Sequence, residues 1–225
     1  MTDRPILFSA PMVQAILDGR KTQTRRAVKP QPAGEIRRGE PDFNHWIDTK
    51  YWERQNQKEN RGIGTRGFAC TYGQPGDRLW VRETWMDLQG TGIEIVTGSR
   101  ERYAYGADTP RGSYGDDQRK CYGLKWRPSI HMPRAASRIT LEITSVRVER
   151  LQDISEAEAL AEGIQRYAGP LRWVRYLDAI TGDAVHSTAR DAFFALWIAL
   201  NGQPSFNANP LVWVLQFKHL QEPRP

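Results

Sequence analysis

The sequence predicts a mixed α+β fold, organised as a single domain over residues 1–225: a small β-barrel with flanking helices. Two observations predict this class. Strand-like segments occur near both ends of the chain, and few helical segments lie between them. Two further stretches, at about 30–75 and 98–137, are rich in glycine, proline or polar residues and predict two long loop insertions.

The N-terminal segment predicts a strand, a short helix, a sharp turn and a second strand. Residues 6–9 form the first strand. Pro11 suits the first turn of a helix over residues 11–17, and Gly19 supplies the left-handed residue that stops it. Threonines and alternation then favour a strand over residues 22–28.

The middle of the chain adds further strands. We expect strands over residues 79–83 and 93–97, and a longer strand over 138–151 whose apolar alternation changes phase near Ser145. A β-bulge there would explain the change and would bend the strand, as a barrel requires.

Two helices and a last strand complete the pattern. Ser155 and Glu158 form a capping box, which predicts a helix that stops at Gly163. Residues 187–200 carry a wide apolar face and predict the strongest helix, and residues 211–220 alternate large apolar side chains as a final strand does.

Composition excludes several classes of protein. The 225 residues are 39% hydrophobic and 26% charged, which excludes a disordered tail and a fibrous repeat. The longest apolar run, residues 192–200, is far shorter than the roughly 20 residues of a membrane span. No signal peptide is recognisable, and Cys70 and Cys121 are too few for a disulfide framework. We therefore expect a soluble, cytoplasmic protein without a membrane partner.

The charge balance favours an anionic partner such as a nucleoside, RNA or DNA. Lys and Arg number 32 against 26 Asp and Glu, which gives a net charge of +6. Most of the cations are arginines, whose planar guanidinium matches phosphate. Between residues 119 and 138 every charged side chain is basic. The alternative interpretation is that such runs are ordinary solvated faces.

Two familiar motifs fail on their context. Residues 62–67 match the dinucleotide-binding fingerprint letter for letter, but the polar residues 55–61 precede them where the fingerprint needs a buried strand. The histidines are far apart in the sequence, and neither cysteine has a neighbour at metal-ligand spacing. We therefore expect no metal and no cofactor.

The segment 19–26 is the strongest candidate for chemistry. It places several cations on a glycine turn that leads into a strand, on which Thr22, Thr24 and Arg26 share one face. Lys21, at the turn, could fold back over Thr24. Partial burial or the neighbouring arginines would lower the pKa of Lys21, so that it could act as a base for a nucleophilic hydroxyl. The alternative is a solvated basic edge strand.

This segment resembles the signature of the ASCH family, PUA-like β-barrel domains marked by a Gly-x-Lys turn and an arginine five residues after the lysine. Gly19, Lys21 and Arg26 match that signature. Three further stretches are similar to the family's opening strand and helix, its Gly-Asp turn and its closing strand: residues 6–16, 76–79 and 211–220. The minimal domain lacks the two insertions, so the chain resembles the larger phage- or prophage-type members.

Within that family, the small bacterial N4-acetylcytidine amidohydrolases are thought to use a lysine, a threonine three residues on and a distant glutamate. Lys21 and Thr24 match this pattern, and Glu162 resembles the glutamate. The resemblance implies metal-independent hydrolysis of the amide of an N4-acylated cytidine. Lys21 would activate Thr24, and Glu162 would protonate the leaving amine. Arg20 and Arg26 would orient the substrate or stabilise the oxyanion.

Two carboxylates compete for the role of proton donor. Glu162 sits at a predicted helix end, where the negative end of the helix dipole disfavours its charge and suits a donor. The alternative is an exposed glutamate of no special function. Glu83 lies at a predicted strand end, where Trp85 could stack on a base of the substrate; a core tryptophan is the other interpretation.

A second functional hypothesis needs no catalysis. PUA-like domains often bind RNA, and the basic stretch with its interleaved aromatic residues could hold RNA or DNA through Lys125, Arg127 and Arg134. A nuclease is a third alternative, since one lysine and one glutamate could also serve phosphodiester chemistry. The sequence gives no indication of the oligomeric state.

Overall fold

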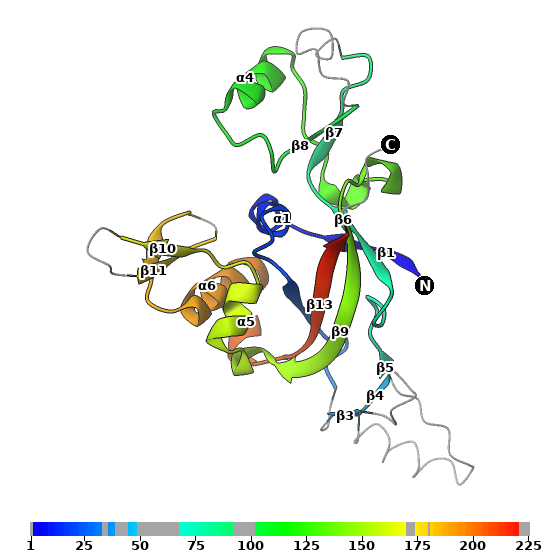
Figure 1. The fold of residues 1–225 in the computed structure, drawn as a ribbon, viewed down its shortest axis with the longest axis vertical. Helices are drawn as coiled ribbons and strands as arrows, with labels where there is room; N and C mark the ends of the chain where they lie inside the picture. The colour runs from blue at the N-terminus through cyan, green and yellow to red at the C-terminus, as the bar shows by residue number, and fades with distance from the viewer. Residues whose placement is uncertain are drawn as a thin grey trace.

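A five-stranded sheet forms the centre of the protein in the computed structural model (Figure 1). The structure describes residues 2–32, 36–38, 45–48, 68–91, 102–169, 174–179 and 181–220. The strand order is β1-β6-β9-β13-β2; β1 and β6 run parallel, and the other neighbours are antiparallel. The strands are β1 (Asp3–Leu7), β6 (Arg78–Arg82), β9 (Thr140–Arg150), β13 (Leu211–Leu220) and β2 (Gln23–Ala27). Helices accompany this sheet, so the predicted α+β class is confirmed.

The sheet is open in the described part of the chain, whereas the sequence predicted a closed small barrel. Its outer strands, β1 and β2, are each paired on one side, and the described strands form no ladder between them. One hydrogen bond links the two outer strands: the Arg26 guanidinium on β2 donates to the main-chain carbonyl oxygen of Leu7 on β1. The predicted bulge is confirmed: Gln216 pairs with Ser145 but Phe217 pairs with Ile143.

The alternation along β13 separates two hydrophobic cores. Trp213, Leu215 and Phe217 join the core that contains α1 (Ala10–Leu17), while Val212 and Val214 join the core of α5 and α6. The predicted flanking helices are present, and they cover both faces of the sheet. The helices of the second core are α5 (Glu156–Ala161) and α6 (Ala189–Asn201), and α7 (Gln203–Asn207) follows them.

The N-terminal elements follow the prediction with one shift. The first strand is β1, Asp3–Leu7, and not residues 6–9, because parallel pairing with β6 begins at Asp3 and Arg78 while Ser9 already caps α1. Gly19 ends α1 with φ of 72°, the left-handed conformation expected of it. The expected strand over residues 93–97 lies outside the described residues.

Both predicted insertions contain regular structure. The first holds a three-stranded sheet, β3 (Ile36–Arg38), β4 (His45–Asp48) and β5 (Phe68–Ala69); residues 62–67 lie outside the described part. The second forms a lobe at the top of Figure 1. That lobe comprises the hairpin β7 (Trp85–Asp87) and β8 (Tyr103–Tyr105) and the helix α4 (Tyr114–Cys121); the short turns η1 (Ser129–His131) and η2 (Arg134–Ala136) follow α4 in the chain.

One further sheet lies between α5 and α6 in the chain and was not predicted. It consists of β10 (Arg166–Ala168), β11 (Val174–Leu177) and β12 (Ala184–His186). The turn η3 (Leu151–Asp153) joins β9 to α5. Across the described ranges, every helix is too short or too polar to cross a membrane.

Candidate active site

The glycine turn after α1 meets the end of α5, which lies far away in the sequence. The amide of Lys21 donates to the carbonyl of Ala15 at 2.8 Å, and the amide of Thr22 donates to the carbonyl of Ala161 at 2.9 Å. Lys21 and Glu162 form an isolated antiparallel bridge. The turns that follow the two helices, at Gly19 and Gly163, therefore bring Lys21 and Glu162 together.

Lys21 and Glu162 form a buried ion pair. Lys21 Nζ lies 2.8 Å from Glu162 Oε2 and 2.7 Å from the main-chain carbonyl oxygen of the same residue. Their side chains are 0% and 4% exposed. Burial lowers the pKa of Lys21, and the contact with Glu162 opposes that shift only in part. Lys21 therefore gives up its proton more easily than an ordinary lysine.

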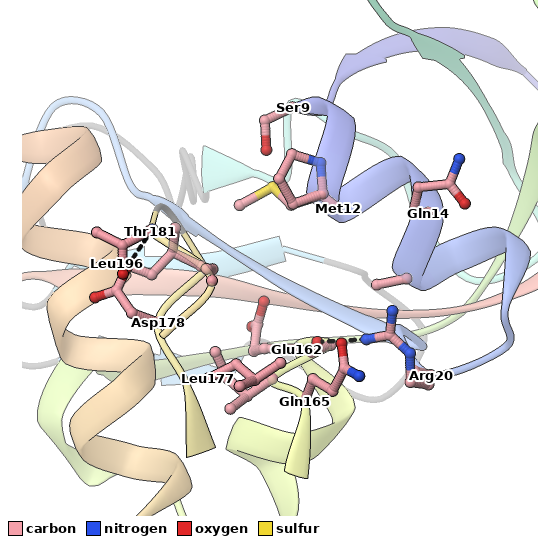
Figure 2. A pocket seen from close by; sticks show the side chains of 16 residues that line it. Ser9, Met12, Gln14, Arg20, Glu162, Gln165, Leu177, Asp178, Thr181 and Leu196 are labelled. Atoms are coloured by element: carbon pink, nitrogen blue, oxygen red, sulfur yellow. Dashed lines mark hydrogen bonds between the residues drawn. The ribbon is translucent and has the colours of Figure 1, made fainter. Parts of the chain in front are cut away.

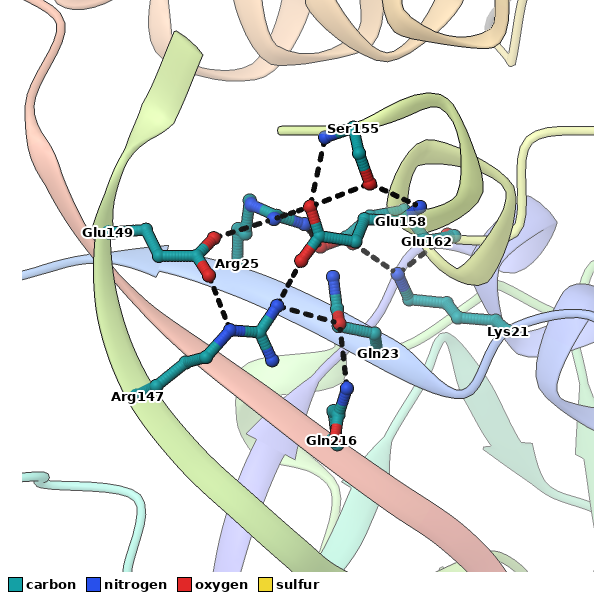
Figure 3. Close-up of polar contacts among 9 residues, drawn as sticks. All are labelled: Lys21, Gln23, Arg25, Arg147, Glu149, Ser155, Glu158, Glu162 and Gln216. Carbon is teal, nitrogen blue, oxygen red and sulfur yellow. Dashed lines mark hydrogen bonds and ion pairs between the residues drawn. The ribbon is translucent and has the colours of Figure 1, made fainter. Parts of the chain in front are cut away.

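The other carboxylate oxygen of Glu162 is held by Arg25. One terminal nitrogen of Arg25 lies 3.3 Å from Glu162 Oε1, and the other lies 3.0 Å from Glu149 Oε2 (Figure 3). Glu158 contributes a third carboxylate, with Oε2 at 3.3 Å from the Arg25 guanidinium. Arg147 bonds to both Glu149 and Glu158, so these three charges and the Arg25–Glu162 pair form one connected network. This network fixes Glu162 from the side opposite Lys21.

Two cavities meet at Glu162. One, of about 280 Å³, is lined by Glu162 and Thr24 and has a mainly apolar wall from α1 and α6. The members of that wall include Met12, Phe193, Leu196, Trp197 and Leu200. The other cavity, of about 350 Å³, opens on the side of α1 and the loop between β11 and β12, where it is lined by Arg20, Gln165 and Asp178 (Figure 2).

Thr24 faces the smaller of these cavities without a hydrogen bond. It pairs with Leu215 on β13, so it lies on the same face of the sheet as Arg26, which pairs with Trp213. The predicted shared face is confirmed for these two residues, whereas Thr22 precedes β2 and is exposed. Thr24 is 3% exposed, and its hydroxyl bonds to no residue in the described part of the chain. Its oxygen is therefore available to a ligand in the cavity.

The two predicted orienting arginines differ in their surroundings. Arg20 pairs with Asp18 at 2.7 Å and donates to the carbonyl of Gly163 at 3.0 Å, at the rim of the larger cavity. The guanidinium of Arg26 stacks over the Phe8 ring at 5.2 Å and lines the smaller cavity. Each arginine thus borders one of the two spaces that flank Glu162.

The structure does not bring Glu83 and Trp85 to this site. Glu83 is 1% exposed and is held by Arg138, whose Nε lies 2.9 Å from Glu83 Oε1. Burial raises the pKa of Glu83, and Arg138 opposes that shift. Trp85 is 4% exposed and packs against Met132 and Ala136, the core position that sequence reasoning had kept as its other interpretation.

The three residues predicted to bind a nucleic-acid strand are split between two places. Lys125 and Arg127 line one cavity of about 460 Å³ in the upper lobe, and Arg127 also stacks over Trp85 at 5.1 Å. Arg134 instead pairs with Asp3 at 2.9 Å, at the start of β1. None of the three lines the cavities at Glu162.

Sequence reasoning missed the arginine that completes the site. Arg25 lies on the face of β2 opposite Thr24, where it stacks over the Phe193 ring at 5.9 Å. A usable signal was the alternation of Arg147 and Glu149 on β9, because two charges on one half-buried face favour charged partners from another element.

Within the described ranges, no three His, Cys, Asp or Glu side chains are grouped closely enough to hold a metal ion. Comparison with known proteins adds no relative: no family model, no curated protein and no solved structure matches this chain.

Proposed function

We propose that this protein is a metal-independent amidohydrolase of the PUA-like ASCH type, which removes the acyl group from an N4-acylated cytidine. The observation that carries the proposal is the buried Lys21–Glu162 pair, whose glutamate shares a cavity with the unbonded hydroxyl of Thr24. A base, an acid and a nucleophile are the three groups that acyl transfer from an amide requires.

The pair supplies the base and the acid through one shared proton. Moving that proton along the 2.8 Å contact converts the ion pair into a neutral lysine and a neutral carboxyl group. Burial favours this neutral form, because both charges are withdrawn from water. In this form Lys21 can accept a proton while Glu162 can donate one.

In the acylation step, Lys21 Nζ takes the hydroxyl proton of Thr24 as Thr24 Oγ1 bonds to the acyl carbon. Glu162 then protonates the exocyclic nitrogen of the base, the carbon–nitrogen bond breaks, and cytidine leaves. The protein is left with an ester on Thr24, a protonated Lys21 and an ionised Glu162. The proton passes from Thr24 to Lys21 either after rotation of the lysine side chain or through one bridging water molecule.

In the second step, water hydrolyses the ester. Glu162 takes a proton from the attacking water, and its oxygen bonds to the acyl carbon. The bond to Thr24 Oγ1 breaks, and Lys21 returns its proton to the threonine. Acid and base thereby recover the protonation states with which they began, and the sum of the two steps is amide plus water giving carboxylic acid plus amine.

The cavity chemistry supports a pyrimidine ring as the occupant. The aromatic and aliphatic wall from α6 offers an apolar surface to a flat ring, and Arg26 offers hydrogen-bond donors at its edge. Arg20, beside the larger cavity, is placed to orient the remainder of the ligand.

Incubation with N4-acetylcytidine tests the proposal, with cytidine release followed by chromatography. The wild type should release cytidine and Lys21→Ala should not, while circular dichroism verifies that the variant is folded. Arg111→Ala, at an exposed position in the upper lobe, is the matched control and should match the wild type. Equal release by Lys21→Ala and the wild type would overturn the mechanism.

A further inference from the structure

A third cavity adjoins the one that holds Thr24 and Glu162. It measures about 410 Å³ and shares Arg26, Ala27 and Asn201 with its neighbour. It lies toward the C-terminal end of β2, where Lys29 follows the strand, and we call it the Lys29 cavity. A ligand in the Thr24 cavity can therefore extend past Arg26 into this second space.

The polar groups of the Lys29 cavity are those that bind an anion. Its lining residues include two cations, Arg26 and Lys29, two hydroxyl groups, of Thr71 and Tyr72, and the amide of Asn201. No carboxylate is among its described lining residues, whereas both cavities at Glu162 carry that carboxylate. An anion would meet attraction here and no like charge from the described lining residues.

Arg26 lines both the Thr24 cavity and the Lys29 cavity, and its guanidinium has a hydrogen-bond donor that is not used. One terminal nitrogen binds the Leu7 carbonyl oxygen, but the buried Nε has no hydrogen-bond partner in the described residues. A buried donor without a partner is costly, which favours a ligand that accepts from it. Lys29 is exposed and forms no ion pair within the part that the structure describes.

We propose that the Lys29 cavity binds a phosphate group attached to the nucleoside in the Thr24 cavity, so that the substrate is a nucleotide or a nucleic-acid strand and not a free nucleoside. Lysine and arginine are the usual phosphate ligands, one as a point charge and the other as a planar donor. This inference rests on the proposed function for the identity of the neighbouring occupant, but the phosphate site itself is defined by its own residues.

Binding measurements test it without requiring catalysis. Calorimetry compares cytidine, cytidine monophosphates with the phosphate at the 5′ or 3′ position, and a short oligocytidylate, each on the wild type, Lys29→Ala and Lys125→Ala. We expect a phosphate-bearing ligand to bind the wild type about tenfold or more tightly than cytidine. Lys29→Ala should lose that preference, and Lys125→Ala should keep it. Additional affinity for the oligocytidylate over both monophosphates would identify a strand as the source of the phosphate.

Two outcomes would overturn the inference. One is equal binding of cytidine and both monophosphates by the wild type, with no gain for the oligocytidylate. The other is a phosphate preference that survives Lys29→Ala and disappears in Lys125→Ala, which would place the anion site in the upper lobe. A preference lost in Lys29→Ala supports the phosphate site even if no cytidine is released from N4-acetylcytidine, so failure of the hydrolase proposal is recognised separately.

Discussion

Lys21 Nζ contacts Glu162 twice, at a carboxylate oxygen 2.8 Å away and at the main-chain carbonyl oxygen 2.7 Å away, across 141 residues of sequence. The main-chain contact fixes the ammonium group relative to the end of α5, and the side-chain contact gives it a partner with which to exchange a proton. Both side chains are withdrawn from solvent, so water and salt screen the contact between them very little.

The first prediction concerns pH. Activity requires one proton on the pair, so kcat/KM for cytidine release should fall when acid adds a second proton and when alkali removes the last one. Because burial lowers the pKa of Lys21, the alkaline limb should lie below 10.5, the ordinary value for lysine. Lys21→Arg should be inactive across the range, since arginine does not deprotonate. An alkaline limb at or above 10.5, with the fold intact by circular dichroism, would contradict a lysine base.

The second prediction concerns Arg25, which contacts Oε1 of Glu162, the carboxylate oxygen that Lys21 does not contact. A lysine in its place keeps the charge but cannot present two nitrogens in a fixed plane. Arg25→Lys should lower kcat about tenfold or more with a smaller change in KM, because Glu162 is no longer aligned. Arg147→Lys is the matched control: Arg147 bonds to Glu149 and Glu158 and to no atom of Glu162 among the described contacts, so its kcat should stay within about twofold. Equal kcat losses would mean that Arg25 acts only through the network.

The third prediction concerns Gly163, at the end of α5. Its φ is 96°, and an added Cβ would lie 2.9 Å from Ala15 Cβ and 3.0 Å from Lys21 Cβ. Gly163→Ala should lower the free energy of unfolding by about 2–3 kcal/mol, from backbone strain and the clash together. Gly19 has φ of 72° and open space around an added Cβ. Gly19→Ala should therefore lower the free energy of unfolding by only about 1 kcal/mol. Urea titration measures both, and similar losses would exclude the tight contact with Lys21.

The fourth prediction separates Glu83 from the chemistry. Glu83→Gln removes the charge from the buried contact with Arg138 and should lower the free energy of unfolding by about 3 kcal/mol. The folded variant should release cytidine at the wild-type rate, because Glu83 lines neither cavity at Glu162. A stable protein with strongly reduced kcat would instead make Glu83 the proton donor.

Local signals predicted the elements that carry the site. The capping box at Ser155 is present, β13 spans the predicted residues 211–220, and the phase change near Ser145 is a bulge. Each depends on residues close together in the sequence, so propensity and periodicity are sufficient to find it.

Features that depend on distant pairing could not be read in the same way. The parallel contact between β1 and β6 and the sheet of β10, β11 and β12 have no local signature, because their partners are set by tertiary packing. From its place at a predicted helix end, Glu162 could be interpreted as an exposed glutamate of no special function. The tertiary structure buries it, and its side chain is 4% exposed. The sequence placed Arg25 only among the cations near Lys21, because its three carboxylate partners come from β9, from α5 and from Glu162 at the end of α5.

The most direct test of the account concerns Thr24. Thr24→Val keeps the size and the β-branched shape of the side chain and removes only the hydroxyl. Thr22→Val, at the residue just before β2, is the control. With N4-acetylcytidine, rapid quenching and peptide mass spectrometry should find an acetyl ester on the peptide that carries Thr24 in the wild type. Thr24→Val should form no ester and release no cytidine, and Thr22→Val should do both. Cytidine release by Thr24→Val at the wild-type rate would contradict the central claim.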